Sequence, residues 1–88
     1  MNSKVRRIIN ECAERHGVSP EMVLGKTRVK QVVYARHEAI YIVRKYLRPR
    51  AVHPNSYSYP NIGRMFGGLD HSTVIHACKT HRARMAGQ

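Results

Sequence analysis

The sequence contains no tryptophan, a single phenylalanine and only five acidic residues, and the shortage of acids restricts its chemistry most. Five carboxylates spread along 88 residues leave little material for the paired acids that general acid–base catalysis uses. No GxxxxGKS or GxxxxGKT phosphate-binding loop is present, and no Ser/His/Asp set stands out. We therefore predict that the chain is not an enzyme and binds no cofactor.

The chain also lacks a long hydrophobic run, and no stretch approaches the roughly 20 apolar residues that span a bilayer. The basic start of the chain, at Lys4, Arg6 and Arg7, is not followed by the apolar segment of a signal peptide. We therefore predict a cytoplasmic protein with no membrane partner.

Cysteine is scarce as well, because Cys12 and Cys78 are the only two and no CxxC pair occurs. Cys12 with His16, and Cys78 with His81, have helical spacings, so four zinc ligands could gather if two helices met. The spacings of zinc fingers are absent, however, and both cysteines also fit apolar helix stripes. We therefore expect reduced thiols in the core and no metal site.

Basic residues, in contrast, are abundant: 16 Lys and Arg give a formal net charge of +11 and occur along the whole chain. Such an excess favours a polyanionic partner, with nucleic acid as the first candidate and an anionic membrane as the second. A basic protein without a specific partner is the remaining alternative. The length fits one domain, residues 1–88, which buries about 60–65% of its unfolded surface.

Apolar periodicity and end signals predict three helices in the first part of the chain. Residues 3–16 carry an apolar stripe closed by Gly17, and residues 19–25 form a short helix capped by Ser19. Residues 31–48 form the longest helix, which Pro49 ends. The residues expected in the core are Val5, Ile8, Ile9, Cys12, Ala13, Val18, Met22, Val23, Leu24, Val32, Ala35, Ala39, Ile40, Val43, Tyr46 and Leu47. The outer side of the longest helix is expected to carry Arg36, His37, Arg44, Lys45 and Arg48.

The last part of the chain predicts a helix-turn-helix. A short helix at 59–66, with Ser58 or Tyr59 as its cap, is followed by the glycine pair Gly67-Gly68 and by a helix at about 70–84. Asp70 caps this last helix. Its inner side carries Val74, Ala77, Cys78 and His81, and its outer side carries Asp70, His71, Ser72, Thr73, Ile75 and Lys79. These outer residues suit the edges of bases in a major groove, although an ordinary capped helix with a solvated first turn fits the spacing equally well.

Two loops remain. Residues 26–30 form a basic loop between two helices, whose Lys and Arg suit phosphates and whose Arg28 suits a narrow minor groove; a solvated basic loop is the alternative. Residues 49–58 contain two prolines and several Ser and Asn, which argues against a regular element. We expect this second loop to be idle, the alternative being that Arg50, His53 and Tyr57 lie against DNA or a partner.

The sequence at 67–78, Gly-Gly-Leu-Asp-His-Ser-Thr-Val-Ile-His-Ala-Cys, resembles the signature of the C-terminal DNA-binding domain (domain IV) of the bacterial replication initiator DnaA. That signature typically runs Gly-Gly-Arg-Asp-His-(Ser/Thr)-Thr-Val-x-His-Ala. The resemblance implies an all-α, Trp-repressor-like helical bundle over roughly residues 3–84, which binds double-stranded DNA at short sites of the DnaA-box kind. Leu69 stands where the family usually has Arg, so we expect one contact to be missing or replaced there.

The resemblance also implies roles for individual residues. The major groove is read by Asp70, His71, Ser72, Thr73 and Ile75, and Arg28 enters the adjacent minor groove. Phosphates are held by Lys26, Lys30, Arg36, His37, Arg44 and Lys79. Because the phosphate-binding loop of the family's ATPase domain does not occur in these 88 residues, we expect a role in regulating replication initiation or transcription by occupying these sites, in competition or contact with the full-length initiator.

Two other functions stay open at this point. A non-specific basic protein that coats nucleic acid would keep the charge but show no sequence preference. A protein-interaction module would bind replication or transcription machinery through the loop at 49–58 and Ile75. The family domain usually continues with another helix after the position of Gln88. We expect a free-standing bacterial or phage-derived product or a fragment, associated with the nucleoid, as a monomer with a dimer as the alternative.

Overall fold

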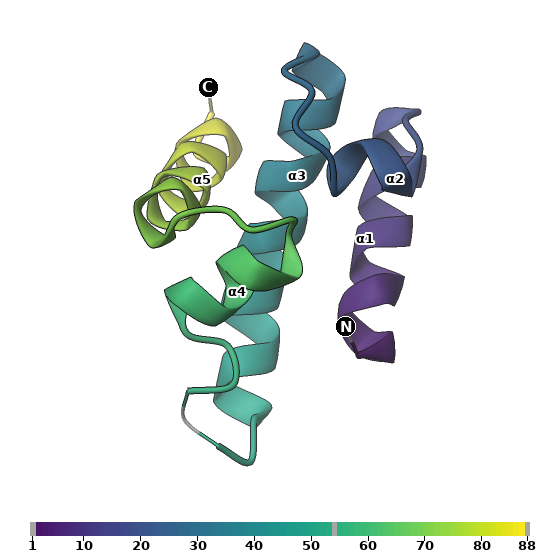
Figure 1. Cartoon of the computed structure of the whole chain (residues 1–88). Coiled ribbons are helices and arrows are strands. Elements are labelled where there is room, and N and C mark those ends of the chain that lie inside the picture. Colours follow the sequence, from purple (N-terminus) through teal and green to yellow (C-terminus); the bar gives the residue numbers. More distant parts are fainter. Residues whose placement is uncertain (1, 54, 88) are drawn as a thin grey trace.

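The computed structural model describes residues 2–53 and 55–87, and within them the chain is helical, without strands. The α-helices are α1 (Ser3–His16), α2 (Pro20–Val23), α3 (Lys30–Ile42), α4 (Tyr59–Met65) and α5 (His71–Met85). Figure 1 shows α3 in the middle of the molecule, with α1 and α2 on one side and α4 and α5 on the other. The predicted all-α bundle with a helix-turn-helix is confirmed.

Polar side chains fix where most of these helices begin. Each of α1, α2, α4 and α5 has a cap whose side chain accepts a hydrogen bond from a free N–H of the first turn, at distances of 2.9–3.3 Å. These caps are Asn2, Ser19, Ser58 and Asp70. Such caps satisfy donors that a helix start otherwise leaves unpaired. The predicted caps Ser19 and Asp70 are confirmed, and of the two caps considered for α4 the structure shows Ser58.

The core lies where α1, α3, α4 and α5 meet, and its largest fully buried side chains include Phe66, Ile9, Ile40 and Ile62. The predicted stripe of the first helix and the predicted inner side of the last helix are confirmed, except that Ile8 and His81 are only half-buried. The prediction that Met22 and Tyr46 lie in the core is wrong, because Met22 is 44% exposed and Tyr46 is 49% exposed. In the four-residue α2 only Val23 turns inward.

The longest helix differs from its prediction at its end. Regular α-helix stops at Ile42, continues as a π-helical turn (Val43–Leu47) and finishes as a 3₁₀ turn (Arg48–Arg50) that includes Pro49. Because a π turn is wider than an α turn, it changes which side chains face the core after Val43. This change explains the exposure of Tyr46.

One residue of the loop that follows belongs to the core. Tyr57 is only 8% exposed, and its hydroxyl accepts a hydrogen bond of 2.8 Å from the side-chain amide of Asn2. The Tyr57 carbonyl accepts a second bond, of 3.0 Å, from Arg44. Tyr57 is therefore held within the protein, whereas Arg50 and His53 of the same alternative are exposed. This side chain ties the beginning of α1 to the helix-turn-helix.

Both cysteines are free and buried, as predicted for core thiols. Burial raises the pKa of the Cys12 thiol to about 12, with the nearby Glu38 carboxylate adding to the effect. Within residues 2–53 and 55–87, no group of three or more His, Cys, Asp and Glu is placed to hold a metal ion. Among the same residues, no helix is long and apolar enough to cross a membrane.

Candidate nucleic-acid interface

The turn between α4 and α5 is held by close backbone contacts. Gly67 and Gly68 have φ values of +85° and +84°, which favour glycine. The carbonyl of Gly63 accepts hydrogen bonds from Gly68 (3.0 Å) and Leu69 (2.8 Å). A Cβ at Gly63 would overlap the Leu69 carbonyl oxygen, and one at Gly67 would lie 2.5 Å from the Leu24 carbonyl oxygen. The turn is therefore fixed against α4 and against the end of α2.

The first turn of α5 follows directly and presents polar side chains. Asp70 accepts hydrogen bonds from the backbone N–H (3.0 Å) and the hydroxyl of Ser72. These bonds are the main reason why the pKa of Asp70 lies below its usual value. The side chains of Asp70 and His71 are 64% and 60% exposed, and Ser72 and Thr73 are exposed too. The structure thus brings these four predicted base-reading residues together at one accessible helix end.

The outer face of α5 continues from this end. His71, Ile75 and Lys79 are four residues apart, so they lie along one side of the helix. Lys79 is exposed, whereas Ile75 is half-buried. Leu69, just before the helix, is also half-buried and packs against the core. The position where the family signature usually has Arg therefore carries no side chain that reaches far into solvent.

The basic loop starts beside this turn, because Leu24 at the end of α2 touches Gly67. Lys26 and Arg28 are exposed, as expected. Lys30 is the first residue of α3 rather than part of the loop, and its ammonium group lies 5.6 Å from the centre of the Tyr34 ring. Two of the three predicted basic contacts thus lie on the loop itself, and the third lies at its junction with α3.

Arg36 is the clearest correction to the predicted site. It does not lie on the outer side of α3, because it is only 9% exposed. Its guanidinium makes five hydrogen bonds of 2.8–3.2 Å to backbone carbonyls of the preceding segment, those of Met22, Val23, Gly25 and Thr27. Burial lowers the pKa of Arg36. Its donors are thus directed at the protein's own backbone, and Arg36 shapes the basic loop instead of holding a phosphate.

His37 is also less available than expected, since it is half-buried. Its Nδ1 accepts a hydrogen bond of 3.0 Å from Arg84, and its ring lies edge-on to His76 with 6.2 Å between centroids. Burial lowers the pKa of His37 to about 4, and the positive charge of Arg84 adds to this shift. The ring is therefore neutral at pH 7 and can offer a phosphate only its Nε2–H.

Arg44 belongs to a basic hollow that sequence reasoning missed. Its guanidinium carbon lies 3.8 Å from the centre of the Tyr59 ring, at the first residue of α4. A hollow of about 350 Å³ here is also lined by Lys45, Arg48 and Arg82. These cations come from α5 and from the turns after α3, so only the fold brings them together. The clustering of basic residues at 44–50 was the one sign of this hollow in the sequence, and nothing in the sequence connects that cluster to Arg82.

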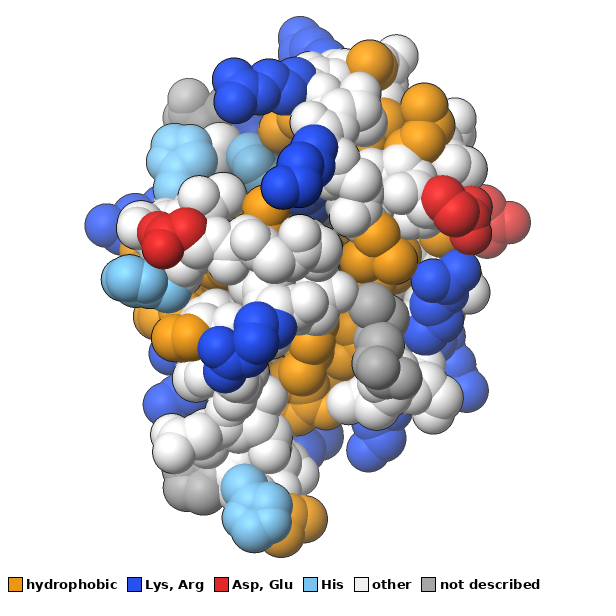
Figure 2. All heavy atoms as spheres, in the orientation of Figure 1, with side chains coloured by type: hydrophobic (Ala, Val, Ile, Leu, Met, Phe, Trp, Pro, Cys, Tyr) orange, Lys and Arg blue, Asp and Glu red, His pale blue; other side chains and the backbone are white. Residues whose placement is uncertain are grey.

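The surface of the molecule is mainly positive, which agrees with a nucleic-acid interface. Figure 2 shows Lys and Arg side chains around the visible face, while acidic side chains appear in two small groups at opposite edges. Three carboxylates are already engaged by the protein itself: Glu21 pairs with Arg6 (3.3 Å), Glu38 pairs with Arg15 (3.2 Å), and Asp70 caps α5. The positive field of the chain is thus opposed by few free acids.

Comparison with known proteins gives a consistent result. Residues 5–80 match the family described as "Bacterial dnaA protein helix-turn-helix". Over 70 residues, 80% of this chain, the sequence is 41% identical to the chromosomal replication initiator protein DnaA of Thermus thermophilus, of which this covers 14%. It is 39% identical over 82 residues to that of Cutibacterium acnes, covering 93% of this chain and 15% of the relative.

A third relative, the DnaA of Sphingopyxis alaskensis, is 50% identical over 59 residues, which are 67% of this chain and 11% of the relative. No solved structure matches the chain significantly. The chain spans about one seventh of the length of the first curated relatives it matches. The family match and these relatives agree with the tight glycine turn and the capped, polar helix end described above. The chain therefore belongs to the helix-turn-helix family of bacterial DnaA proteins.

Proposed function

We propose that this chain binds double-stranded DNA sequence-specifically, at sites of the DnaA-box kind, with the N-terminal end of α5 in the major groove. The observation that carries the proposal is the accessible set of Asp70, His71, Ser72 and Thr73 on a helix end that is held by a rigid turn. His71 donates to a base acceptor, and the two hydroxyls bond either kind of base edge. Asp70 keeps its capping bonds and uses its remaining lone pairs to accept from cytosine N4.

The proposed contacts on either side of the base-reading residues use exposed basic side chains and the half-buried Ile75. Ile75 gives apolar contact to a thymine methyl group, and Arg28 enters the adjacent minor groove from a loop whose start touches the α4–α5 turn. Phosphates are held by exposed Lys26, Lys30 and Lys79 and by the hollow around Arg44. Phosphate contacts position a protein on DNA, whereas base contacts specify the site.

The names of the chain's relatives support a proposal for its biological role. Its relatives are named chromosomal replication initiators, and the matched segment is a small part of each of them. By occupying the same kind of site, the chain regulates replication initiation or transcription in competition with a full-length initiator. We further propose that it acts as a monomer in the bacterial cytoplasm.

The test compares two alanine variants on two duplexes by fluorescence anisotropy. His71→Ala should cost about 1–3 kcal/mol on a DnaA-box duplex and little on a random duplex. Lys79→Ala, the matched variant two turns further along the same face, should weaken both duplexes alike and lower the salt slope by about one unit. Equal losses on both duplexes for His71→Ala would remove the base-reading role and favour a protein that coats nucleic acid through charge alone.

A further inference from the structure

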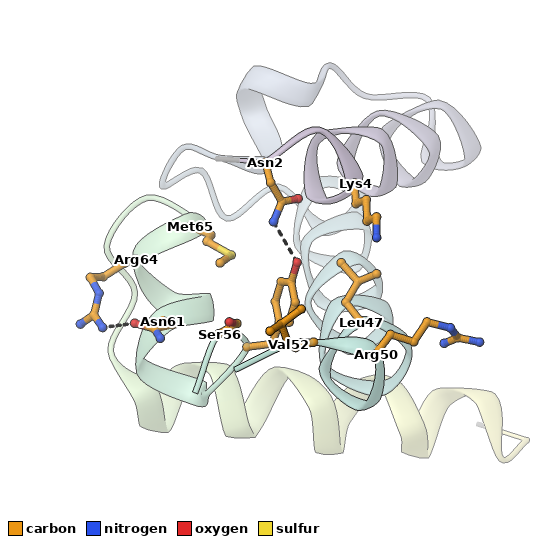
Figure 3. A pocket seen from close by; sticks show the side chains of 11 residues that line it. Asn2, Lys4, Leu47, Arg50, Val52, Ser56, Asn61, Arg64 and Met65 are labelled. Carbon is orange, nitrogen blue, oxygen red and sulfur yellow. Dashed lines mark hydrogen bonds between the residues drawn. The ribbon is translucent and has the colours of Figure 1, made fainter. Parts of the chain in front are cut away.

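A hollow of about 680 Å³ lies outside the surface described so far. It is formed by the beginning of α1, the turns that extend α3, the loop that follows them, and α4 (Figure 3). In Figure 1 these segments lie at the end of α3 opposite the loop at 26–30. The hollow is open on one side, and its volume is large enough for a few side chains of a peptide.

All of the charged residues that line this hollow are positive. Lys4, Arg50 and Arg64 line it, and no Asp or Glu is among its lining residues. Figure 3 shows Arg64 on one flank and Lys4 with Arg50 on the opposite flank. Among the described residues, the guanidinium groups of Arg50 and Arg64 donate hydrogen bonds only to uncharged oxygens. Arg50 donates to the Tyr46 carbonyl, and Arg64 donates to the side-chain oxygen of Asn61. The hollow therefore favours an occupant with at least two negative charges set apart from each other.

Between these cations the hollow is lined by the polar side chains of Asn2, Ser56 and Asn61 and by an apolar group that we call the aliphatic floor. Leu47, Val52 and Met65 form this floor, and Val52 lies at its open side, because it is 92% exposed. A valine so exposed has an apolar surface that nothing in the described chain covers. Tyr57 offers no open ring face, because it is only 8% exposed and its hydroxyl is bonded to Asn2. Bases stack on exposed aromatic faces, so this floor suits an aliphatic or aromatic side chain better than a nucleotide.

We propose that this hollow docks an acidic peptide segment of a partner protein, with one apolar side chain seated between flanking carboxylates. The cations on the two flanks attract the carboxylates, and the aliphatic floor takes the apolar side chain. A second copy of this chain is a poor occupant, because it has only five acidic residues, three of which are engaged in its own contacts. The proposal does not depend on DNA binding, since it uses none of the residues assigned to DNA.

The test uses a fluorescein-labelled ten-residue peptide of Asp and Glu with a central Leu-Phe pair. Two control peptides have the same length, one entirely acidic and one with Lys in place of the acids. We expect the first peptide to bind at least tenfold more tightly than either control, equivalent to about 1.4 kcal/mol. Amide NMR shifts should be concentrated at residues lining the hollow, such as Lys4, Val52 and Met65. A duplex that saturates the protein should not displace the peptide.

A matched pair of variants separates the hollow from general charge. Val52→Asp puts a carboxylate at the open side of the aliphatic floor, whereas His53→Asp adds the same charge one residue away, at an exposed position that does not line the hollow. We expect Val52→Asp to weaken the peptide at least about tenfold and His53→Asp less than about twofold, as for a screened surface charge. Equal weakening by both variants, equal binding of the all-acidic peptide, shifts centred on α5, or no binding would each overturn the proposal.

Discussion

Replacing Arg36 tests the most consequential difference between the sequence and the structure. The Arg36 bond to the Val23 carbonyl (2.8 Å) is buried, and the bonds to three further carbonyls are partly buried. Losing a charged donor from a buried acceptor costs about 2–3 kcal/mol, and each carbonyl that water can reach costs about 0.5–1 kcal/mol more. Arg36→Met should therefore lower the free energy of unfolding by about 3.5–6 kcal/mol.

The assay is thermal unfolding followed by far-UV circular dichroism, with Arg36→Met, Arg36→Lys and Arg28→Met compared. In a domain of this size, each kcal/mol lowers Tm by about 4–8 °C, so Arg36→Met should lower its Tm by at least about 14 °C. Lysine keeps the charge but lacks the planar fork, so Arg36→Lys should also be clearly destabilised. The exposed control, Arg28→Met, should stay within about 0.5 kcal/mol of the parent chain.

The Arg36→Met variant should also bind DNA differently from the parent chain. Below its Tm, Arg36→Met should weaken binding to every duplex, because the loop that carries Lys26 and Arg28 loses its support. The salt slope should stay near that of the parent protein, since Arg36 itself neutralises no phosphate. An Arg36→Met protein with unchanged Tm and a salt slope reduced by one unit would refute the reasoning, because that is the behaviour of a phosphate contact.

Three further predictions follow from the geometry. Gly63→Ala should cost about 2–3 kcal/mol in urea unfolding, because its Cβ overlaps the Leu69 carbonyl; an unchanged midpoint would contradict this. Because the pKa of His37 is about 4 when folded and about 6.5 when unfolded, the unfolded state binds more protons between these values. The stability that His37 contributes, at most about 3 kcal/mol, should be complete above pH 6.5 and be lost as the pH falls towards 4; His37→Gln should flatten that profile. Arg28→Ala should weaken binding most where the flanking minor groove is A·T-rich, and an equal loss beside G·C-rich flanks would argue against minor-groove insertion.

Local signals in the sequence predicted the helices well. The caps Ser19, Ser58 and Asp70 act within one turn of themselves, so they can be identified without knowledge of the fold. The end of the longest helix could not be predicted in the same way. The π turn at Val43–Leu47 changes the register that an ideal helical period assumes, and Tyr46 therefore points away from the expected core.

The same difference between local signals and contacts made by the fold applies to the candidate site. The exposed end of α5 follows from a contiguous motif and its cap, and the structure agrees with it. Arg36 was misplaced because a charged residue is normally assigned to the surface, although its spacing of four from Val32 and from Ile40 is that of the inner stripe. The carbonyls that compensate its burial belong to a loop whose path no helical period predicts.

The positions of Tyr57 and of the basic hollow depend on segments far apart in the chain. Tyr57 pairs with Asn2 across 55 residues, and Arg82 joins the cations that follow α3. Neither contact has a sequence pattern of its own, because each is created when helices dock. Leu69 shows the opposite case, in which one departure from a family signature is explained by packing against the core.

The central claim is that the exposed end of α5 reads a DNA sequence. Its most direct test is fluorescence anisotropy at physiological salt with a DnaA-box duplex and a scrambled duplex of the same composition. The account predicts that the box duplex binds about a thousandfold or more tightly than the scrambled duplex. Equal, roughly micromolar and steeply salt-dependent binding to both duplexes would contradict it, because charge alone would then explain the affinity.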